Sequence, residues 1–401
     1  WYKYCNSTRR EVNMDYSTTH SHIARTPIKA NPPVLKVIGL GGGGQNAVDR
    51  MIELGLEGVQ FIAANSDAQV LQHSQADLKI QLGRKITRGL GAGGDPAVGQ
   101  AAAEESIAEL TSALTGADMV FLTAGMGGGT GTGAIPVAAR VAKSVGAVVV
   151  AVVSLPFSFE IGRRQTNARN GLLMLQQHTD TLITVPNDRL LQVAPRNLPI
   201  EMAFRLADDI LRQGIQGISE LITQPGLINV DFSHIKNMML NGGGSLLAIG
   251  TGKGENRVSD ALEHALHHPM LESIDLEDAS GIIANFTGGN DLPFFEVTEA
   301  LNTLQEKSGG MAEIVPGIIC DDRMEDRVQV ILVLTGIGTT ALDPQRMKRP
   351  VPVMTPAEDT DKETSLSPGN SYQENIPDVH PELAAAQSEL DVPAFMRRKA
   401  R

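Results

Sequence analysis

The stretch of residues 118–145 reads DMVFLTAGMGGGTGTGAIPVAARVAKSV and carries the most specific pattern in the chain. Residues 118–124 predict a buried strand, a glycine loop occupies 125–133, and a helix is predicted from there to about residue 145. Between Gly127 and Gly133, here called the Thr-Gly loop, five glycines and two threonines offer N–H groups and hydroxyls to an anion. The loop has no lysine and is therefore not a P-loop of the G-x-x-x-x-G-K-[S/T] type.

A first glycine loop, residues 39–44, follows a strand predicted over 34–38 and precedes a helix. Gly39, Gly41 and Gly44 match G-x-G-x-x-G, a pattern that lets the backbone approach a phosphate at a helix N-terminus. The pattern also allows a Rossmann-type NAD(P) oxidoreductase, in which Asp67 would be the acid that ends the second strand. That alternative leaves the Thr-Gly loop unexplained.

A third glycine loop, residues 91–95, ends at Asp95-Pro96, a favourable helix start. The helix is predicted to run to about Leu114. Three glycine loops that each precede a helix are expected to close around a di- or triphosphate.

The rest of the chain predicts two α/β blocks joined by a long helix over about 200–222. Apolar residues cover this helix widely, which indicates contact on more than one side. In the second block, strands and helices do not alternate strictly, so a mixed sheet is expected, with a hairpin at residues 320–326. The other predicted elements are strands 59–64, 147–156, 181–185, 245–250, 281–287, 313–319 and 327–334, and helices 163–178, 258–266 and 292–307.

Composition limits the function classes. The chain has 401 residues, 42% of them hydrophobic, and a formal net charge of −12, which disfavours a general nucleic-acid binder. The longest apolar run, 147–156, is shorter than the roughly 20 residues of a membrane helix. Two cysteines, Cys5 and Cys320, form no metal-ligand spacing and fit a reducing cytoplasm.

Both ends have the composition of segments outside a packed core. Residues 1–33 are polar and patternless and are expected to be a disordered arm, or partly the result of a misassigned start, with Met14 as a candidate. From Thr339 the chain is rich in Pro, Ser, Thr and acidic residues, as flexible linkers are. An apolar cluster beside basic residues, 391–401, then predicts a docking peptide on a tether.

Several segments resemble the tubulin/FtsZ family of cell-division GTPases. The Thr-Gly loop resembles the family's signature loop, and residues 39–48 are similar to its first phosphate loop. Further similar segments are 65–69, 156–160, 186–188, 229–232 and the C-terminal peptide 391–398.

The resemblance implies a tubulin/FtsZ-like α/β fold with a parallel-sheet GTP-binding domain and a smaller mixed-sheet domain joined by a central helix. The expected organisation is arm 1–33, GTP-binding domain 34–199, central helix and start of the catalytic loop 200–229, second α/β domain 230–338, linker 339–380 and docking peptide 381–401.

The resemblance also implies the site residues. Phosphate contacts would come from Gly42, Gly43, Gly44, Gln45, Asn46, Ala92, Gly93, Gly94, Gly129, Thr130, Gly131, Thr132 and Gly133. Glu160 and Arg164 would face the ribose or phosphate, and Asn187, Phe204 and Asp208 would hold guanine. The catalytic loop of a neighbouring subunit would supply Asn229, Asp231 and His234, so that hydrolysis follows head-to-tail assembly.

His234 departs from the family pattern Asn-x-Asp-Phe-x-Asp, in which the second acid orients the attacking water. One hypothesis is that the neutral imidazole partly replaces this acid, which predicts slow turnover that falls on acidification and rises in His234→Asp. The alternatives are that His234 faces solvent and Asp231 suffices, or that the chain is a nucleotide-binding structural paralogue with little GTPase activity.

GTP or GDP is the expected ligand, with Mg²⁺ held chiefly by phosphate oxygens and water and no protein metal ligand assigned. His264, His267 and His268 are interpreted as a solvated helix end. The expected partners are further copies of the chain and, through residues 391–398, membrane-tether and regulatory division proteins. No nucleic-acid partner and no direct membrane insertion are expected, and the location implied is cytoplasmic, at the division site.

Overall fold

The structure is a computed structural model that describes residues 32–337 except 161, 196, 225–229, 241 and 272–274. Residues 1–31 of the predicted arm, the linker 339–380, the docking peptide and Asn229 lie outside the described residues. Within the described ranges, no helix is long and apolar enough to cross a membrane.

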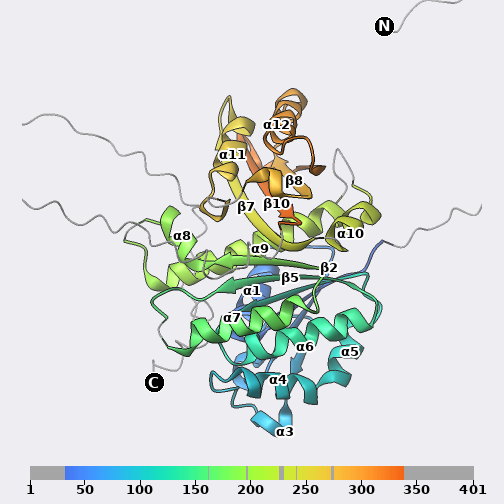
Figure 1. The fold of residues 1–401 in the computed structure, drawn as a ribbon, viewed down its shortest axis with the longest axis vertical. Coiled ribbons are helices and arrows are strands. Elements are labelled where there is room, and N and C mark those ends of the chain that lie inside the picture. The colour runs from blue at the N-terminus through green and yellow to red at the C-terminus, as the bar shows by residue number, and fades with distance from the viewer. Residues whose placement is uncertain are drawn as a thin grey trace, which may run out of the picture. The chain divides into compact units, whose positions relative to one another are not determined.

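A parallel sheet forms the first part of the fold (Figure 1). Its strands run in the order β3-β2-β1-β4-β5-β6. Strands β1, β4 and β5 are buried along almost their whole length, because helices cover both faces of the sheet. The strands are β1 Leu35–Leu40, β2 Val59–Asn65, β3 Leu78–Gln81, β4 Met119–Gly125, β5 Val148–Leu155 and β6 Thr181–Pro186.

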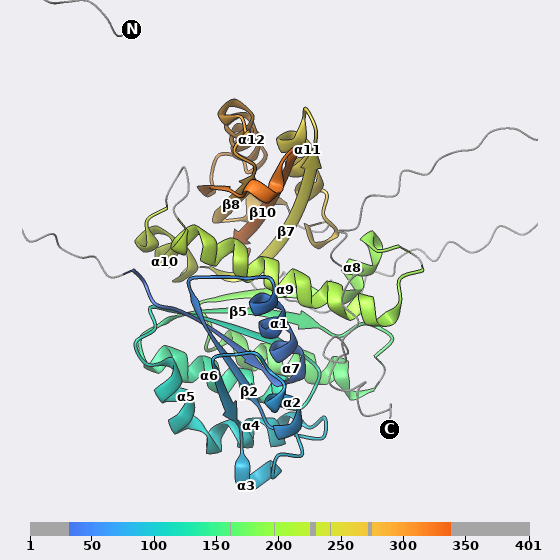
Figure 2. The same ribbon diagram turned by 180° about the vertical axis from the view of Figure 1, so that it is seen from behind.

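Two hydrophobic clusters lie on the two faces of this sheet. Side chains of α1 and α9 contribute to one cluster, and those of α4, α5, α6 and α7 contribute to the other. Figures 1 and 2 show these two groups of helices on opposite sides of the strands. The helices are α1 Gly41–Glu53, α2 Ala68–Gln72, α3 Arg84–Thr87, α4 Pro96–Glu105, α5 Ile107–Leu114, α6 Thr130–Ser144, α7 Arg163–Gln176, α8 Asn187–Val193 and α9 Ile200–Thr223.

The helix predicted from Asp95 to Leu114 is two helices, α4 and α5. Asp95 caps α4 as predicted, because its carboxylate accepts from Ala97 N. The break falls at Ser106, whose hydroxyl accepts a hydrogen bond from Gly83 N at 3.0 Å. A serine that bonds to neighbouring backbone competes with helix continuation, and the apolar pattern alone does not show this.

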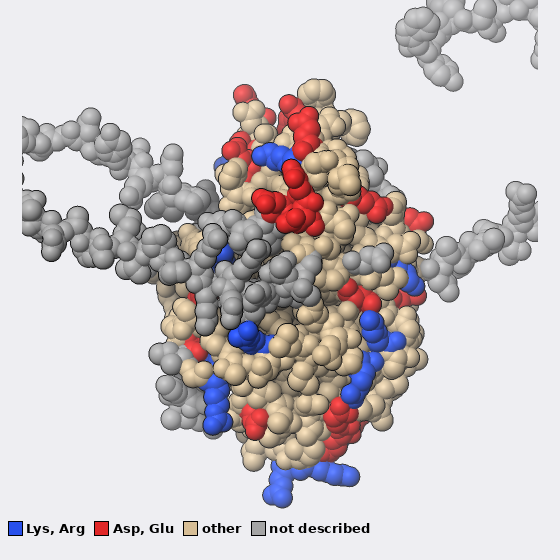
Figure 3. Space-filling model, in the orientation of Figure 1, with Lys and Arg blue, Asp and Glu red and all other residues tan. Residues whose placement is uncertain are grey.

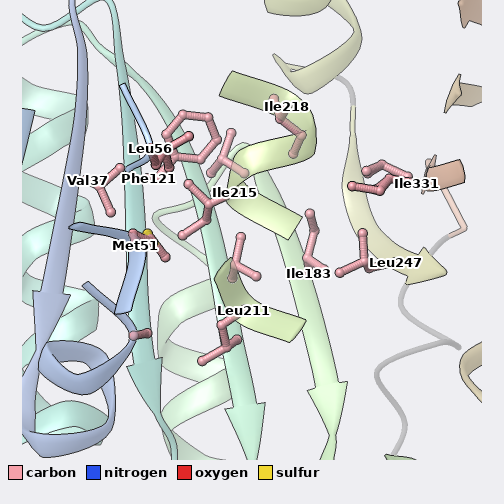
Figure 4. Packing of buried hydrophobic residues seen from close by; sticks show 14 of the residues in the cluster. Val37, Met51, Leu56, Phe121, Ile183, Leu211, Ile215, Ile218, Leu247 and Ile331 are labelled. Atoms are coloured by element: carbon pink, nitrogen blue, oxygen red, sulfur yellow. The ribbon is translucent and has the colours of Figure 1, made fainter. Parts of the chain in front are cut away.

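The long helix α9 packs on two sides, as its apolar pattern predicts. Leu211, Ile215 and Ile218 lie between the parallel sheet and strands of the second block (Figure 4). A Cβ on Gly214 would lie 2.9 Å from Leu247 Cδ2, and one on Gly217 would lie 2.9 Å from Ile331 Cδ1. These glycines let α9 approach β7 and β10 closely.

The second block packs around a third hydrophobic cluster. Its sheet is mixed, as expected: β10 pairs antiparallel with β7 and β8, and β8 pairs parallel with β9. The elements are α10 Phe232–Leu240, β7 Gly243–Lys253, α11 Arg257–Leu266, β8 Gly281–Gly288, α12 Phe294–Lys307, β9 Glu313–Cys320 and β10 Arg327–Thr335, with short 3-10 turns at Pro269–Leu271, Leu276–Asp278 and Asp322–Met324.

Strand β7 joins the two parts of the sheet. It pairs parallel with β6 through residues 243–245 and antiparallel with β10 through 246–253. The described strands therefore form one ten-stranded sheet, with β3 at one edge and β9 at the other. β3 has four residues, and β9 contains Pro316.

The hairpin predicted at residues 320–326 is wrong. β9 and β10 are consecutive in the chain, but β8 lies between them in the sheet. Helix α12 connects β8 to β9, so these two strands form a parallel β-α-β unit. The short connection 321–326 therefore joins two strands, β9 and β10, that are not neighbours in the sheet.

Candidate functional site

The first glycine loop forms the carboxyl end of β1 and the first turn of α1. Gly41 has a φ of +68°, a conformation that favours glycine. A Cβ on Gly41 would lie 2.7 Å from Gly131 N, and one on Gly44 would lie 2.3 Å from Thr123 O. The loop is therefore packed backbone to backbone against β4 and the Thr-Gly loop. Gly42 and Gly43 remain partly exposed at the N-terminus of α1, and N–H groups at a helix N-terminus bind anions.

The Thr-Gly loop continues directly into α6, which begins at Thr130. Thr132 Oγ1 accepts from Gly127 N at 2.8 Å and ties the loop to its own helix. Gly133 N donates to Gly129 O at 3.0 Å, so this N–H already belongs to the helix. The N–H groups before it lie in the first turn, which has no intrahelical acceptors for them.

The third glycine loop lies against the Thr-Gly loop. Ala92 is buried, and a Cβ on Gly129 would lie 2.9 Å from its methyl group. Gly93 and Gly94 are exposed with φ of +60° and +82°. Asn167 Nδ2 of α7 donates to Gly94 O and to Gly127 O, each at 3.3 Å. Asn167 thus bridges two loops, a role that its sequence context did not indicate.

Gln45, predicted among the phosphate residues, has a buried side chain. Its Nε2 donates to Val70 O at 2.9 Å, and its Oε1 accepts from Asn65 Nδ2 at 3.4 Å. These bonds join α1 to β2 and α2, so the side chain supports the loop from behind. The following residue, Asn46, is partly exposed.

Glu160 and Arg164 form an ion pair beyond the carboxyl end of β5. Glu160 Oε2 lies 2.7 Å from Arg164 Nη1, and Oε1 accepts from Phe157 N at 2.9 Å. Phe157 also contacts Phe204 of α9 edge to face, with ring centroids 5.3 Å apart. The pair and the aromatic rings connect the β5 end to the start of α9.

Asn187 begins α8 directly after β6, so it lies at the same edge of the sheet as the glycine loops. Its side chain is buried, and its Oδ1 has no hydrogen-bond partner among the described residues. A buried polar atom without a partner costs stability, so such atoms often mark ligand sites. A guanine N–H would satisfy this oxygen.

Asp208 lies on α9, the helix that packs against α1. Desolvation and, to a smaller extent, the charge of Asp209 raise the pKa of its carboxyl, and Arg50 lowers it; the net pKa is about 8. Within the described ranges this carboxylate forms no hydrogen bond, and a group with a strongly shifted pKa often belongs to a functional site.

Asp67, the acid that the NAD(P) alternative requires after the second strand, has a structural role instead. Asp67 Oδ1 accepts from Gln69 N and Val70 N, so Asp67 is the N-cap of α2. An acid that caps a helix has a local structural reason to follow the second strand.

The predicted catalytic loop begins α10. Asp231 is exposed, and its Oδ1 accepts from Ser233 N at 3.0 Å, as at a helix N-cap. His234 Nε2 lies 2.6 Å from Glu313 Oε1 of β9. His234 therefore does not simply face solvent, and Glu313 is a partner that the local sequence did not indicate.

Helix α9 separates the two groups of predicted residues. α8 packs against α9, and Figures 1 and 2 show α8 and α10 at opposite ends of that helix. Asp208 and Thr223 are 15 residues apart on it, a rise of about 22 Å at 1.5 Å per residue. Asp231 lies beyond that end, far from the glycine loops of its own chain.

The histidines at the end of α11 were interpreted as solvated. His264 and His267 are exposed, with Nδ1 atoms 2.6 Å from Thr251 O and 2.9 Å from Glu263 O. His268 is half-buried, and burial lowers its pKa to about 4, so the interpretation was wrong for this residue. The described residues contain no group of three or more His, Cys, Asp or Glu side chains placed to hold a metal ion.

The chain is similar to known proteins over most of its described length. Residues 34–195 match the GTPase domain of the Tubulin/FtsZ family, and residues 243–338 match the C-terminal domain of the FtsZ family. An empty FtsZ dimer from M. jannaschii is 43% identical with a TM-score of 0.74, over 77% of this chain and 90% of that chain. The chain belongs to the FtsZ family. The family's proteins are GTPases that bind GTP or GDP. The general activity of this FtsZ-like chain is therefore that of a GTPase.

Other solved structures share the architecture. A mutant of M. jannaschii FtsZ is 44% identical with a TM-score of 0.74, over 76% of this chain and 91% of that chain. CetZ2 from Haloferax volcanii, a GTPγS-bound protofilament, is 21% identical with a TM-score of 0.63, over 78% of this chain and 98% of that chain. At that identity the CetZ2 likeness supports the tubulin/FtsZ fold and nothing finer.

Proposed function

We propose that this chain binds GTP across its three glycine loops, polymerises head to tail and hydrolyses GTP at the contact between subunits. The observation that carries the proposal is the separation along α9: Phe204 and Asp208, which would hold guanine, lie in its first half, and Asp231 lies beyond its C-terminal end. A single chain cannot bring Asp231 to its own nucleotide, whereas a second copy stacked on the first can.

The residues present fit a guanine nucleotide. The first turns of α1 and α6 offer N–H groups to phosphates. At the base, Asn187 Oδ1 and the Asp208 carboxylate are acceptors that match guanine N–H donors, and Phe204 supplies an aromatic face. Mg²⁺ would accompany the triphosphate, held mainly by phosphate oxygens and water.

The surface supports contact between copies. Leu90, beside the third glycine loop, is 72% exposed, and Met311, two residues before Glu313, is 86% exposed. Exposed apolar side chains next to both halves of the site would be buried by stacking. Figure 3 shows basic side chains at the tip formed by α3 and mainly acidic ones over the second block; these charged regions lie on either side of α9 and not at its two ends.

The hydrolytic step depends on positioning and charge. Asp231, exposed at the N-terminus of α10, would direct a water in line with the γ-phosphate of the neighbouring subunit. Hydrolysis then follows assembly, and a filament weakens as its GTP is used. In the cell, such filaments would form the cytokinetic ring, with residues 391–398 docking to membrane-tether and regulatory division proteins.

Mixing two defective variants tests this proposal. Asp208→Ala should lose guanine binding but keep a complete catalytic loop, and Asp231→Ala should have the opposite defect. Neither alone should release phosphate from GTP at an appreciable rate, whereas the mixture should, because one subunit's loop meets the other's nucleotide. A mixture as inactive as its components, although it co-sediments, would exclude a site completed in trans.

A second candidate function is a nucleotide-binding structural paralogue with little GTPase activity. The observation that favours it is that His234, in place of the family's second acid, is already paired with Glu313. Phosphate release and light scattering measured on the same samples across a concentration series distinguish the two. Scattering without phosphate release would support the paralogue, and turnover that begins with scattering would support the GTPase.

A further inference from the structure

The pair formed by His234 and Glu313 connects two elements that are distant in sequence. His234 lies in the first turn of α10, and Glu313 is the first residue of β9. Their Nε2 and Oε1 atoms are 2.6 Å apart, and each side chain is 58% exposed. Exposure of this size leaves both groups accessible to a second subunit.

The backbones on both sides of the pair are fixed. His234 N donates to Asp231 O at 2.9 Å, and Glu313 N donates to Ser280 O at 3.1 Å. An exposed pair of this kind contributes at most about 1 kcal/mol to stability. Stability is therefore a weak reason for the pair, and its position beside Asp231 suggests a role in the reaction.

We propose that Glu313 is a positioning residue for GTP hydrolysis, which holds His234 so that its Nδ1 can accept a proton from the attacking water on the neighbouring subunit's nucleotide. The inference rests on the proposed function, in which Asp231 and His234 act in trans. A carboxylate accepts the Nε2 proton, so the neutral ring keeps its lone pair on Nδ1. Among the described residues, none forms a hydrogen bond with that nitrogen.

The step balances without a further reactant. The water oxygen forms a bond to the γ-phosphorus, the bond from that phosphorus to the β–γ bridging oxygen breaks, and GDP leaves with the electron pair. The water proton passes to Nδ1 and then to solvent. While the imidazolium exists, the Glu313 carboxylate lies beside its positive charge, as in other carboxylate–histidine pairs.

The pair also restores the charge that the loop lacks. An imidazole and a carboxylate together carry one negative charge, as the family's second aspartate does. The charged groups around His234 are Glu313 on β9 and, on its own segment, Asp231 and Lys236. In this chain the acid therefore comes from a strand that lies 79 residues after His234, and not from the loop itself.

A double-mutant comparison in the full-length chain tests the inference. Glu313→Gln should lower kcat for GTP by about 10- to 100-fold, as loss of a partner that orients a functional histidine does, while Glu313→Asp should retain part of the activity. In a His234→Asp background, Glu313→Gln should have no effect, because the acid is then supplied directly. Glu306→Gln, which removes an exposed charge from α12 of the same block, is the matched control and should match the parent.

The outcomes separate the two levels of the argument. An equal loss from Glu313→Gln in both backgrounds would mean a structural role and would overturn the inference. If Asp231→Ala stops hydrolysis and Glu313→Gln does not slow it, the inference alone fails. If Asp231→Ala leaves hydrolysis unchanged, the proposed function fails.

A second measurement does not depend on turnover. In the GDP-bound protein, ¹⁵N shifts of the His234 ring, assigned by comparison with His234→Gln, should show the proton on Nε2 at pH 8. Glu313→Ala should give a mixture of both tautomers. A tautomer distribution that Glu313→Ala leaves unchanged would contradict the positioning role.

Discussion

The nucleotide side of this chain and its α10 side are built in different ways. The glycine loops depend on backbone, with approaches such as the one between Gly44 and Thr123 O that exclude any side chain. At α10 and the neighbouring start of β9, the groups proposed to act are exposed side chains, Asp231, His234 and Glu313. The difference suggests that substitutions in the loops change the fold, whereas substitutions at α10 change the reaction.

The largest effect is expected from a methyl group in the Thr-Gly loop. A Cβ on Gly133 would lie 2.0 Å from Pro96 O, where α4 and α6 meet. Gly133→Ala should cost about 3 kcal/mol or more, since overpacking against backbone has no simple relaxation. Urea unfolding and binding of a fluorescent GTP analogue should both show the loss. Gly128→Ala is the control, because no atom lies within 4 Å of its Cβ position; equal losses in both variants would contradict this account.

At α10, Asp231 combines a cap with a proposed catalytic charge. Both Asp231→Ala and Asp231→Asn should lower kcat by about 10²–10⁴-fold, while GTP binding remains. Asparagine keeps the cap, so Asp231→Ala alone should also lose about 1 kcal/mol of stability. Phosphate release, nucleotide binding and thermal unfolding of the two variants check this. Full turnover in Asp231→Asn would show that the charge is unnecessary.

Asp208 gives the nucleotide side a pH dependence. Its pKa is about 8 in the folded chain, against 3.8 for a freely exposed aspartate carboxyl. Because the folded-state pKa is raised, the contribution of this carboxyl to the free energy of unfolding is greatest below about pH 4. This contribution is lost progressively as the pH rises to about 8. Asp208→Asn should remove this loss and stabilise the nucleotide-free chain at pH 8 by at least about 1 kcal/mol.

Guanine binding should change with pH in the opposite direction. The carboxylate form accepts guanine N–H groups, so affinity should rise by up to about tenfold per pH unit as pH approaches 8. Asp208→Asn should bind more weakly and without this slope. Titrations with a fluorescent GTP analogue at pH 6, 7 and 8 measure it, and parallel profiles for parent and variant would rule out Asp208 as the titrating group.

The smallest effect is expected at Thr132, whose hydroxyl accepts from Gly127 N. Thr132→Val leaves this N–H without its partner and should cost about 1 kcal/mol, with weaker nucleotide binding as the loop loosens. Thr132→Ser keeps the acceptor and should behave like the parent. Equal stability of the valine and serine variants would show that the bond does not hold the loop.

The sequence predicted the elements whose signals are local. Glycines between an apolar run and a helical pattern indicated loops that lead into helices, and wide apolar coverage indicated a helix packed on two sides. The hairpin failed because short spacing between strands says nothing of a third strand inserted between them; the helix before β9 was the better signal, since it predicts a parallel unit with β8.

Long-range contacts left no local signal. Glu313 is 79 residues from His234, and nothing in its own segment distinguishes it from any exposed acid at a strand start. Gln45 looked like a loop residue because of the glycines before it, and its side chain turns to Val70 only when α2 is in place. Asn167 likewise bridges loops that come together through the parallel sheet.

The edges of the ten-stranded sheet matter for a protein that is proposed to stack on further copies of itself. An exposed sheet edge invites pairing with another edge, which leads to aggregates without defined length or polarity. Here one edge is the four-residue strand β3, and the other is β9, where Pro316 lacks an N–H to donate. Lateral sheet extension is therefore discouraged at both edges, which would leave the proposed head-to-tail stacking as the open direction of growth.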